Sequence, residues 1–353
     1  MLTLLTTPFL IASTFLTPAE TPPAKQRVTL KREKQRVAVL VDGQLFTAYI
    51  YPDASVLKKA ALYPILTATG NPITRGWPMD PRPGERVDHP HHVGMWFNYG
   101  DVNGHDFWNN SSAIGPEHKG PFGTIVTTNI ARLNEAGNRA ELTVEADWQG
   151  QDGKPMLRET TLFTFEADGQ TRRIDRKTTL TALAQDVTFR DNKEGMIALR
   201  VARQLEHPST KPELFTDASG KATAVPQLNN EGVTGKYLSQ NGKEGDAVWG
   251  TRAPWVVLTG TLPGNGGAGS EAVSVTLFDH PGNVGYPTYW HARGYGLFAA
   301  NPLAPSVFSN GKETPMNYVL KAGQSITFRH RLHLAPGTLS AGAADREARA
   351  FGR

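Results

Sequence analysis

Histidine is concentrated in one short segment of this 353-residue chain. The string DHPHHVGMWFNYGDVNGHDFW, at residues 88–108, holds four of the ten histidines: His89, His91, His92 and His105. Imidazole titrates near neutral pH and is the commonest metal ligand, so such a cluster suits either acid–base chemistry or a metal. The apolar run Val93–Phe97 predicts a buried strand. If the extended conformation reaches back through the histidines, His89 and His91 share one face and His92 points the other way.

A second group of polar and aromatic side chains lies far downstream. The string DHPGNVGYPTYWHARGYGLFAANP, at residues 279–302, contains Trp290, His291, Arg293 and Asn301. Aromatic rings stack on sugar rings, while guanidinium and amide groups bind hydroxyls and carboxylates. This pattern favours a sugar site, in which Trp290 stacks and Arg293 and Asn301 hold substrate oxygens. The alternative is a core strand in which Trp290 is buried and Arg293 is paired with an acid.

We expect the two strings to form one site, with His91 and His291 within roughly 10 Å of each other so that both can reach one sugar ring. His89, His91 and His291 are then the acid–base candidates, because proton transfer needs groups with a near-neutral pKa. Glu194 is a further candidate base at the mouth of a strand, with a turn carboxylate as its alternative.

Other polar residues of the first string are candidates for substrate binding, and they are His92, Asn103, His105 and Asp106. A metalloenzyme stays open as another reading, with a divalent metal held by His89, His91 and His105, or by Asp106 in place of His105. The chain has no cysteine, which excludes disulfides, thiolate nucleophiles and cysteine-ligated metals.

The hydrophobic periodicity is mostly two residues, which indicates strands. Glu141–Trp148 alternates strictly, and Gln324–Leu334 does so with His330 on its inward, core-facing side. We expect further strands at Arg36–Val41, Leu45–Tyr51, Phe122–Leu133, Leu157–Glu166, Arg172–Leu183, Met196–Ala202, Trp255–Gly260 and Glu271–Asp279. Lys31–Arg36 is predicted to be a polar turn between strands. A helix is predicted only at Ala341–Ala350. Many strands separated by turn residues predict an all-β fold, a large antiparallel β-sandwich.

The chain is expected to begin with an export signal. Residues 1–24 carry an apolar stretch followed by small residues and prolines, although they lack a basic start. We therefore expect a periplasmic or secreted bacterial protein, with residues 25–353 as one sandwich domain. Residues 207–248 form a long polar insertion, expected to be mobile without ligand. No other stretch has the roughly 20 apolar residues of a membrane helix, so an integral membrane protein is not expected.

Charge and motifs exclude other classes. The formal net charge is +4 and its basic residues are dispersed, which gives no nucleic-acid footprint. Residues 264–269 match G-x-G-x-x-G, but a β-patterned segment follows where a dinucleotide site needs a helix. We interpret them as a hairpin loop and expect no nucleotide cofactor.

The strings at residues 88–108, 193–200 and 279–302 resemble the bacterial PmoA-like family of unknown function, also labelled methane oxygenase. The resemblance runs from about Val28 to His333. At position 93 many members of the family have an arginine where this chain has Val93, so any function of that arginine cannot be assigned to this chain. Methane oxidation is rejected, because that activity belongs to a membrane protein of long apolar helices. The resemblance implies a β-sandwich protein associated with sugar-converting enzymes.

Together these observations predict a carbohydrate-active enzyme of epimerase, lyase or hydrolase type. Its fold would be a sandwich of the galactose-mutarotase-like supersandwich type. A non-catalytic carbohydrate-binding protein, in which the histidines only shape a polar groove, is the alternative.

Overall fold

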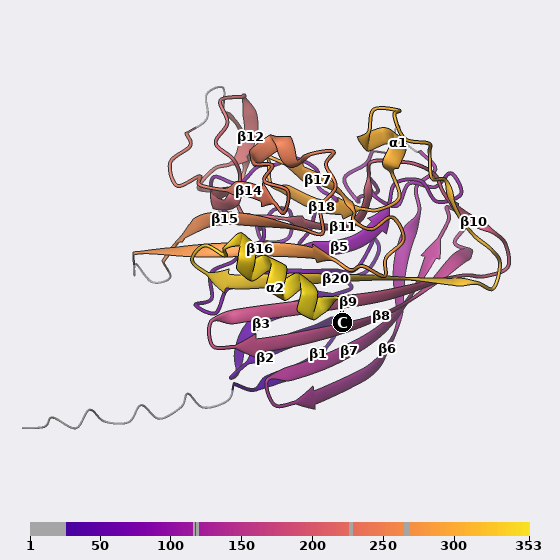
Figure 1. The fold of residues 1–353 in the computed structure, drawn as a ribbon, viewed down its shortest axis with the longest axis horizontal. Helices are drawn as coiled ribbons and strands as arrows, with labels where there is room; N and C mark the ends of the chain where they lie inside the picture. The colour runs from indigo at the N-terminus through magenta and orange to yellow at the C-terminus, as the bar shows by residue number, and fades with distance from the viewer. Residues whose placement is uncertain (1–25, 116, 118–119, 226–228, 265–268) are drawn as a thin grey trace, which may run out of the picture.

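Two eight-stranded antiparallel sheets lie face to face and form the body of the molecule (Figure 1). The structure is a computed structural model, and it describes residues 26–353 except 116, 118–119, 226–228 and 265–268. The predicted export signal at residues 1–24 lies outside the described residues. The all-β antiparallel sandwich predicted from the sequence is confirmed.

The first sheet contains, in spatial order, β1 (Val28–Glu33), β2 (Arg36–Val41), β3 (Gln44–Ile50), β4 (Ala61–Ile65), β5 (Met95–Tyr99), β11 (Gly195–Arg200), β18 (Leu297–Asn301) and β17 (Tyr289–Arg293). The second sheet contains β14 (Lys236–Ser239), β15 (Trp255–Pro263), β16 (Ser270–Asp279), β20 (Ser325–Pro336), β9 (Thr171–Ala182), β8 (Pro155–Asp168), β7 (Arg139–Gln149) and β6 (Thr124–Ala136).

Shorter elements complete the fold. Two-stranded sheets pair β10 (Val187–Phe189) with β19 (Tyr318–Leu320) and β12 (Glu213–Thr216) with β13 (Ala222–Val225). Within the described residues, the structure has the helices α1 (Pro305–Phe308) and α2 (Ala341–Phe351) and the 3-10 turns η2 (Arg203–Leu205) and η3 (Gly245–Val248).

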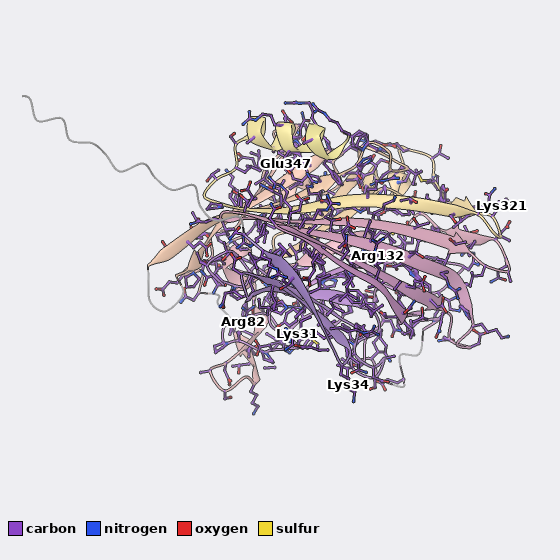
Figure 2. All side chains as sticks on the ribbon, turned by 90° about the horizontal axis from the view of Figure 1, so that it is seen from below. Lys31, Lys34, Arg82, Arg132, Lys321 and Glu347 are labelled. Atoms are coloured by element: carbon purple, nitrogen blue, oxygen red, sulfur yellow. The ribbon has the colours of Figure 1, made fainter. Side chains whose placement is uncertain are left out.

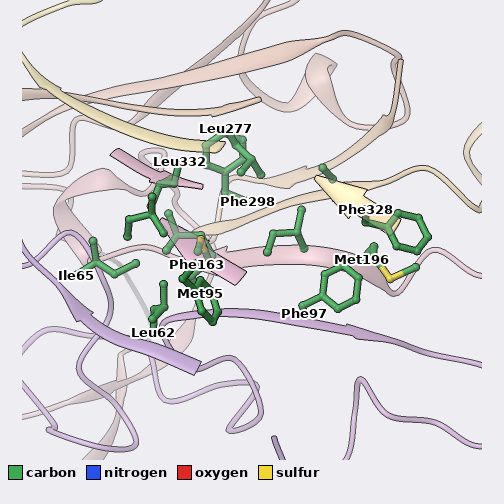
Figure 3. Close-up of a cluster of buried hydrophobic side chains, with 14 of the residues drawn as sticks. Leu62, Ile65, Met95, Phe97, Phe163, Met196, Leu277, Phe298, Phe328 and Leu332 are labelled. Atoms are coloured by element: carbon green, nitrogen blue, oxygen red, sulfur yellow. The ribbon is translucent and has the colours of Figure 1, made fainter. Parts of the chain in front are cut away.

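The main core lies between the two sheets and receives alternate side chains from both. Phe97 of the first sheet contacts Trp148 and Phe328 of the second, with ring centroids 6.3 and 5.8 Å apart. Figure 3 shows Met95, Phe97 and Met196 gathered with Phe163 and Phe328. His330 is buried in this core, as its place in the alternation predicted.

Helix α2 covers the outer face of the second sheet. Its N-cap Ser340 accepts a hydrogen bond from the Ala343 backbone, and its apolar side packs on Trp255 and Phe278. Glu347 on this helix binds Arg331 of β20, at 2.8 Å. Figure 2 shows α2 on the outside of the molecule with Glu347 labelled on it.

The outer face of the first sheet carries the chemistry described below. In β17, Trp290 and Ala292 face the core, so His291 and Arg293 point to the opposite face. In β5 the same alternation turns Trp96 to that outer face. Residues separated by almost 200 positions thus share one surface, because β11 and β18 lie between β5 and β17.

Two sequence predictions about local structure are corrected. The polar run Lys31–Arg36 ends β1 and begins β2, and only two residues form the turn, because an edge strand tolerates charged side chains. The segment 207–248 is not wholly a loop. Lys236–Ser239 pairs with β15 as an edge strand, and η3 follows it.

Candidate active site

The first histidine string forms a tight turn rather than an extended segment. The backbone N–H of His92 donates to the carbonyl of His89 at 2.9 Å, and His89 has φ of +45°. The predicted alternation, with His92 pointing away from His89, is therefore wrong. A turn of this spacing returns the chain on itself, so the rings of His89 and His92 stack 4.7 Å apart and 6° from parallel.

Two buried arginines hold this turn in place. Arg75 donates to the carbonyls of His89 and His92, both at 3.0 Å, and to a carboxylate oxygen of Asp88 at 2.6 Å. Arg200 of β11 donates to the same Asp88 oxygen, also at 2.6 Å. Because both guanidinium groups are buried, this carboxylate is the counter-charge that makes their burial tolerable.

The other oxygen of Asp88 binds His89. Oδ2 of Asp88 lies 2.6 Å from Nδ1 of His89. Burial opposes ionisation of Asp88, but the hydrogen bond with His89 and the charges of Arg200 and Arg75 outweigh it and hold the pKa of Asp88 well below its usual range. The ionised carboxylate can only accept, so Nδ1 of His89 carries the hydrogen and Nε2 of the neutral ring is a free base.

His89 is the accessible member of the cluster. Its side chain is 41 % exposed, whereas His91, His92 and His291 are buried. Its second face stacks on Tyr295, with centroids 5.2 Å apart and rings 2° from parallel. The ring is therefore fixed between His92 and Tyr295 while its edge faces outward.

A row of directly opposed residues crosses the outer face of the first sheet. Trp96 of β5 pairs with Ala198, Ala198 pairs with Ala299, and Ala299 pairs with His291 of β17. The two alanines leave space between the large side chains, and the ring of Trp108 packs there.

Trp108 connects the two histidine strings. Its ring centroid lies 5.7 Å from that of His92 and 6.5 Å from that of His291. The structure thus brings both predicted strings into one cluster of rings.

Buried polar atoms without partners mark this cluster. Among the described residues, Nε2 of His91, Nε2 of His92, Nε1 of Trp96 and Nδ1 of His291 are buried with no hydrogen-bond partner. Most buried polar groups in proteins are paired, so four unpaired ring nitrogens in one cluster are unusual.

Electrostatics keep the buried imidazoles neutral. Burial, followed by the charge of Lys59, lowers the pKa of His91 to about 2. Burial, then His91 and Arg200, holds the pKa of His92 well below its usual range. Nδ1 of His92 lies 3.2 Å from the Arg200 guanidinium, which can only donate. The hydrogen of neutral His92 is therefore on Nε2, which is an unpaired donor like Nε1 of Trp96.

The second acid–base pair is His291 with Glu194. Nδ1 of His291 lies 3.8 Å from Oε2 of Glu194, whose carboxylate also binds the amine of Lys193. Burial, followed by the charges of Lys193 and Arg293, lowers the pKa of His291 to about 3. The predicted candidates His291 and Glu194 thus lie side by side.

A pocket of about 400 Å³ adjoins the cluster and is lined by Arg86, His207, Pro208, Ser209, Lys211, Glu213, Asp246, Trp249, Ala292, Arg293, Gly294 and Tyr295. Tyr295 belongs to both places, since its ring stacks on His89 and lines the pocket. The exposed Arg293 lies over the rings of Trp249 and Tyr295, at 6.0 and 5.9 Å. Arg293 thus lines this pocket, and its predicted role in substrate binding stays a prediction.

Two residues predicted to bind substrate are structural instead. Trp290 lies fully in the core, and its Nε1 donates to the carbonyl of Ala253 at 2.9 Å. Asn301 is also fully buried, and its amide donates to the carbonyls of Asn192 and Lys193. The sugar-contact roles predicted for both are therefore wrong. Asn301 instead positions the loop that carries Glu194.

Residues 103–106 form a turn outside the ring cluster. The amide of Asn103 joins this turn to β10, accepting from Thr188 and donating to Asp186. One oxygen of Asp106 accepts from the backbone of Trp108 at 2.8 Å, which fixes the turn that presents that ring. Asn103 and Asp106 thus support the site, and their side chains are already engaged in hydrogen bonds.

His105 lies in the same turn, with its ring beside Gly150. The predicted metal set of His89, His91 and His105 is therefore not assembled. Within the described part of the chain, no three histidine, aspartate or glutamate side chains gather in a way that could hold a metal ion.

Sequence reasoning missed the residues that organise the turn. Arg75 lies 13 residues before Asp88, and nothing in its sequence neighbourhood indicates that it binds the turn. Asp88 directly precedes His89, so the sequence does suggest that these two side chains form a pair. Lys59 is also buried, donates to the carbonyl of His91 at 2.7 Å, and lies over the Trp96 ring. Burial lowers the pKa of Lys59 to about 7, despite nearby Asp106.

This chain belongs to DUF6807, a family of unknown function, which it matches over residues 36–349. The predicted membership in a family of unknown function is therefore confirmed. The matched family is not described as PmoA-like, so that part of the resemblance stays a prediction. No curated protein sequence matches the chain. No helix in the described ranges is long and apolar enough to span a membrane.

Several solved structures are distantly similar. A GH36 alpha-galactosidase from Geobacillus stearothermophilus, in complex with 1-deoxygalactonojirimycin, has 11% identity and a TM-score of 0.37, and 89% of this chain spans 41% of that chain. A putative aldose 1-epimerase from Escherichia coli K12 has 11% identity and a TM-score of 0.29, over 88% of this chain and 99% of that one. A GalM/aldose epimerase homologue from C. elegans has 9% identity and a TM-score of 0.25, over 89% and 100%. At these scores the similarity carries no functional argument.

Proposed function

We propose that this protein is a carbohydrate-active enzyme that moves a proton at a carbon atom of a sugar, with His89 as the base. The observation that carries the proposal is the Asp88–His89 pair, at 2.6 Å, whose ring is 41 % exposed beside a buried cluster of unpaired ring nitrogens. A base held in one tautomer by an ionised carboxylate is the arrangement used for general base catalysis.

The proton transfer is balanced without a cofactor. Nε2 of His89 takes a proton from a C–H group next to a carbonyl or carboxyl carbon, and the C–H electron pair moves onto the adjacent oxygen. Return of a proton to the carbon gives an epimer, while departure of a substituent on the next carbon gives elimination.

Glu194 and His291 form a second carboxylate–imidazole pair near this base. Neutral His291 has an unpaired ring nitrogen facing the carboxylate of Glu194 at 3.8 Å. Because burial holds His291 neutral, His89 is the group that takes the proton and then returns it, either to the carbon or to the leaving group.

The test is solvent-deuterium exchange. The protein is incubated in D₂O with a panel of mono- and oligosaccharides and of uronates, and proton NMR follows each C–H signal. We expect one carbon-bound hydrogen of one sugar type to be lost with the protein and retained without it. A sugar that binds but shows neither exchange nor conversion would contradict the proposal.

A non-catalytic carbohydrate-binding protein is the second candidate. The observation that favours it is the burial of His91, His92 and His291, whose packed rings also suit a rigid polar groove. In that case calorimetry would detect binding of a saccharide whose hydrogens the wild-type protein does not exchange with D₂O.

Export is part of the proposal and rests on residues 1–24 alone. N-terminal mass spectrometry on protein from the native envelope should find a mature end between about Ala19 and Lys25, where small residues follow the apolar run. Intact Met1 in a cytosolic fraction would overturn it.

A further inference from the structure

The pocket beside the histidine cluster has more positive charge than its carboxylates neutralise. Arg86 is buried and bound to Glu206 at 2.7 Å and to Glu213 at 2.6 Å. Arg293 and Lys211 line the same pocket, and among the described residues neither side chain makes a hydrogen bond or an ion pair. The remaining lining carboxylate is that of Asp246.

Asp246 is already engaged at the rim. Its carboxylate accepts from the backbone of Gly294 at 3.1 Å and lies 3.7 Å from Nδ1 of His207. Burial lowers the pKa of His207, so this ring adds no positive charge at neutral pH. The pocket therefore presents two free cations, Arg293 and Lys211, against the single carboxylate of Asp246, which no cation among the described residues neutralises.

Arg293 is also oriented for a ligand. Its guanidinium lies over the rings of Trp249 and Tyr295, which restricts a side chain that is otherwise exposed. An unpaired buried donor sits on the same wall, since Nε1 of Trp249 has no partner among the described residues. A planar guanidinium with a neighbouring N–H donor matches a carboxylate, which accepts two parallel hydrogen bonds.

The positive charge of Arg293 lies close enough to His89 to assist the proposed proton transfer. His89 and Arg293 both lie beside the Tyr295 ring, at 5.2 and 5.9 Å. A carbon next to a carboxylate loses its proton only when the carboxylate charge is neutralised, because the electron pair moves onto those oxygens. A guanidinium that binds the carboxylate makes that carbon acidic enough for a neutral imidazole to act.

We propose that the pocket at Arg293 binds the carboxylate of a uronate-containing saccharide, so that acidic rather than neutral sugars are the substrate class. The pocket volume of about 400 Å³ suits one or two sugar units. The catalytic consequence rests on the proposed function: His89 removes the hydrogen on the carbon that carries the carboxylate. The binding preference itself stands without any turnover.

Calorimetry on the full chain separates these two statements. The probes are methyl glycosides of glucuronate, galacturonate and mannuronate, each with its carboxyl methyl ester and its neutral hexose counterpart. For at least one stereochemistry we expect the uronate to bind roughly tenfold or more tightly than its ester and its hexose, the size expected for a lost charge-assisted pair. If all three forms bind equally, or if none of the acids binds, the inference is wrong.

Variants assign the preference to the pocket. Arg293→Gln should remove the preference for the acid and leave the weaker binding of the ester, while Arg293→Lys should restore part of it. Arg32→Gln on the exposed strand β1 is the matched control and should bind as the wild type does. If Arg293→Gln retains the full preference, the carboxylate is bound elsewhere and the assignment falls.

Failure of the proposed function gives a different result. If the uronate binds through Arg293 but its hydrogens do not exchange with D₂O, the ligand class is right and the catalytic proposal is wrong. If a neutral sugar exchanges its hydrogens and no uronate is preferred, the catalytic proposal stands and this inference is overturned.

Discussion

Nδ1 of His89 lies 2.6 Å from Oδ2 of Asp88, while the other oxygen of Asp88 binds two buried arginines. One carboxylate thus performs two tasks, since it orients the accessible imidazole and neutralises Arg75 and Arg200. Substitutions at the two residues of the pair should therefore behave differently.

Asp88→Asn should destabilise the fold. It leaves the guanidinium groups of Arg75 and Arg200 buried without their counter-charge, which costs about 3 kcal/mol or more of unfolding free energy. His89→Gln should cost less than about 1 kcal/mol, because that side chain is 41 % exposed. Urea denaturation followed by fluorescence measures both. Equal stabilities would show that Asp88 does not hold the arginines.

Stability should decrease as the pH falls below neutrality. The pKa is about 2 for His91 and about 3 for His291 and His330, all below the usual value of 6.5. Between pH 6.5 and 4 the unfolded chain therefore binds protons that the folded chain does not, which favours unfolding. Asp279 opposes this, because burial raises its pKa to about 7 and its contribution is lost as pH rises.

Three histidines oppose this one carboxyl group. The slope of unfolding free energy against pH should therefore keep the sign that the histidines give it, with stability falling as the pH falls. His91→Gln should reduce the slope by up to about 1.4 kcal/mol per pH unit, which is the linkage of one proton. Denaturation midpoints at several pH values test this. A His91→Gln variant with the wild-type slope would mean that His91 is protonated in the folded state.

The polar insertion should contain two regions of different stability. Lys236–Ser239 is hydrogen-bonded to β15 at the edge of a large sheet, so its amides should exchange slowly with solvent. The strands β12 and β13 form a two-stranded sheet, a unit that is marginal alone, so they should exchange faster. Hydrogen exchange with peptide resolution checks this. Equal protection across residues 213–239 would contradict it.

Trp290 should contribute to packing and not to ligand binding. Trp290→Phe removes a buried hydrogen bond to Ala253 and should cost about 1–3 kcal/mol of stability. Trp249→Phe, by contrast, alters the pocket wall and should weaken saccharide binding. Calorimetry on both variants decides this. Loss of binding in Trp290→Phe with unchanged stability would restore the sugar-stacking role.

The fold was largely predictable because its strands alternate. The ranges expected for Arg36–Val41 and Glu141–Trp148 match β2 and β7, and the expected C-terminal helix matches α2 within one residue. The missed strand β1 carries charged residues that an exposed edge tolerates, which masks its alternation. The edge strand β14 was missed because its surroundings are polar.

The candidate site was predictable in its residue types and less in its geometry. His89 and His291 lie at one ring cluster because the sheet order brings β5 near β17, and Arg293 lines the adjoining pocket. The roles of Trp290 and Asn301 could not be predicted, since alternation alone does not say which face of a strand meets the core. The role of Arg75 could not be predicted from the sequence. A buried arginine is recognised by the distant backbone groups that it binds, and these are not its neighbours in sequence.

The central claim is that His89 is the base, and the most direct test is the rate of solvent-deuterium incorporation by His89→Gln. The measurement uses the saccharide that exchanges with the wild type, under conditions in which both proteins are folded. Loss of a general base should lower the rate by about 100-fold or more while binding persists. A His89→Gln variant that exchanges the same hydrogen within a few-fold of the wild-type rate would contradict the account.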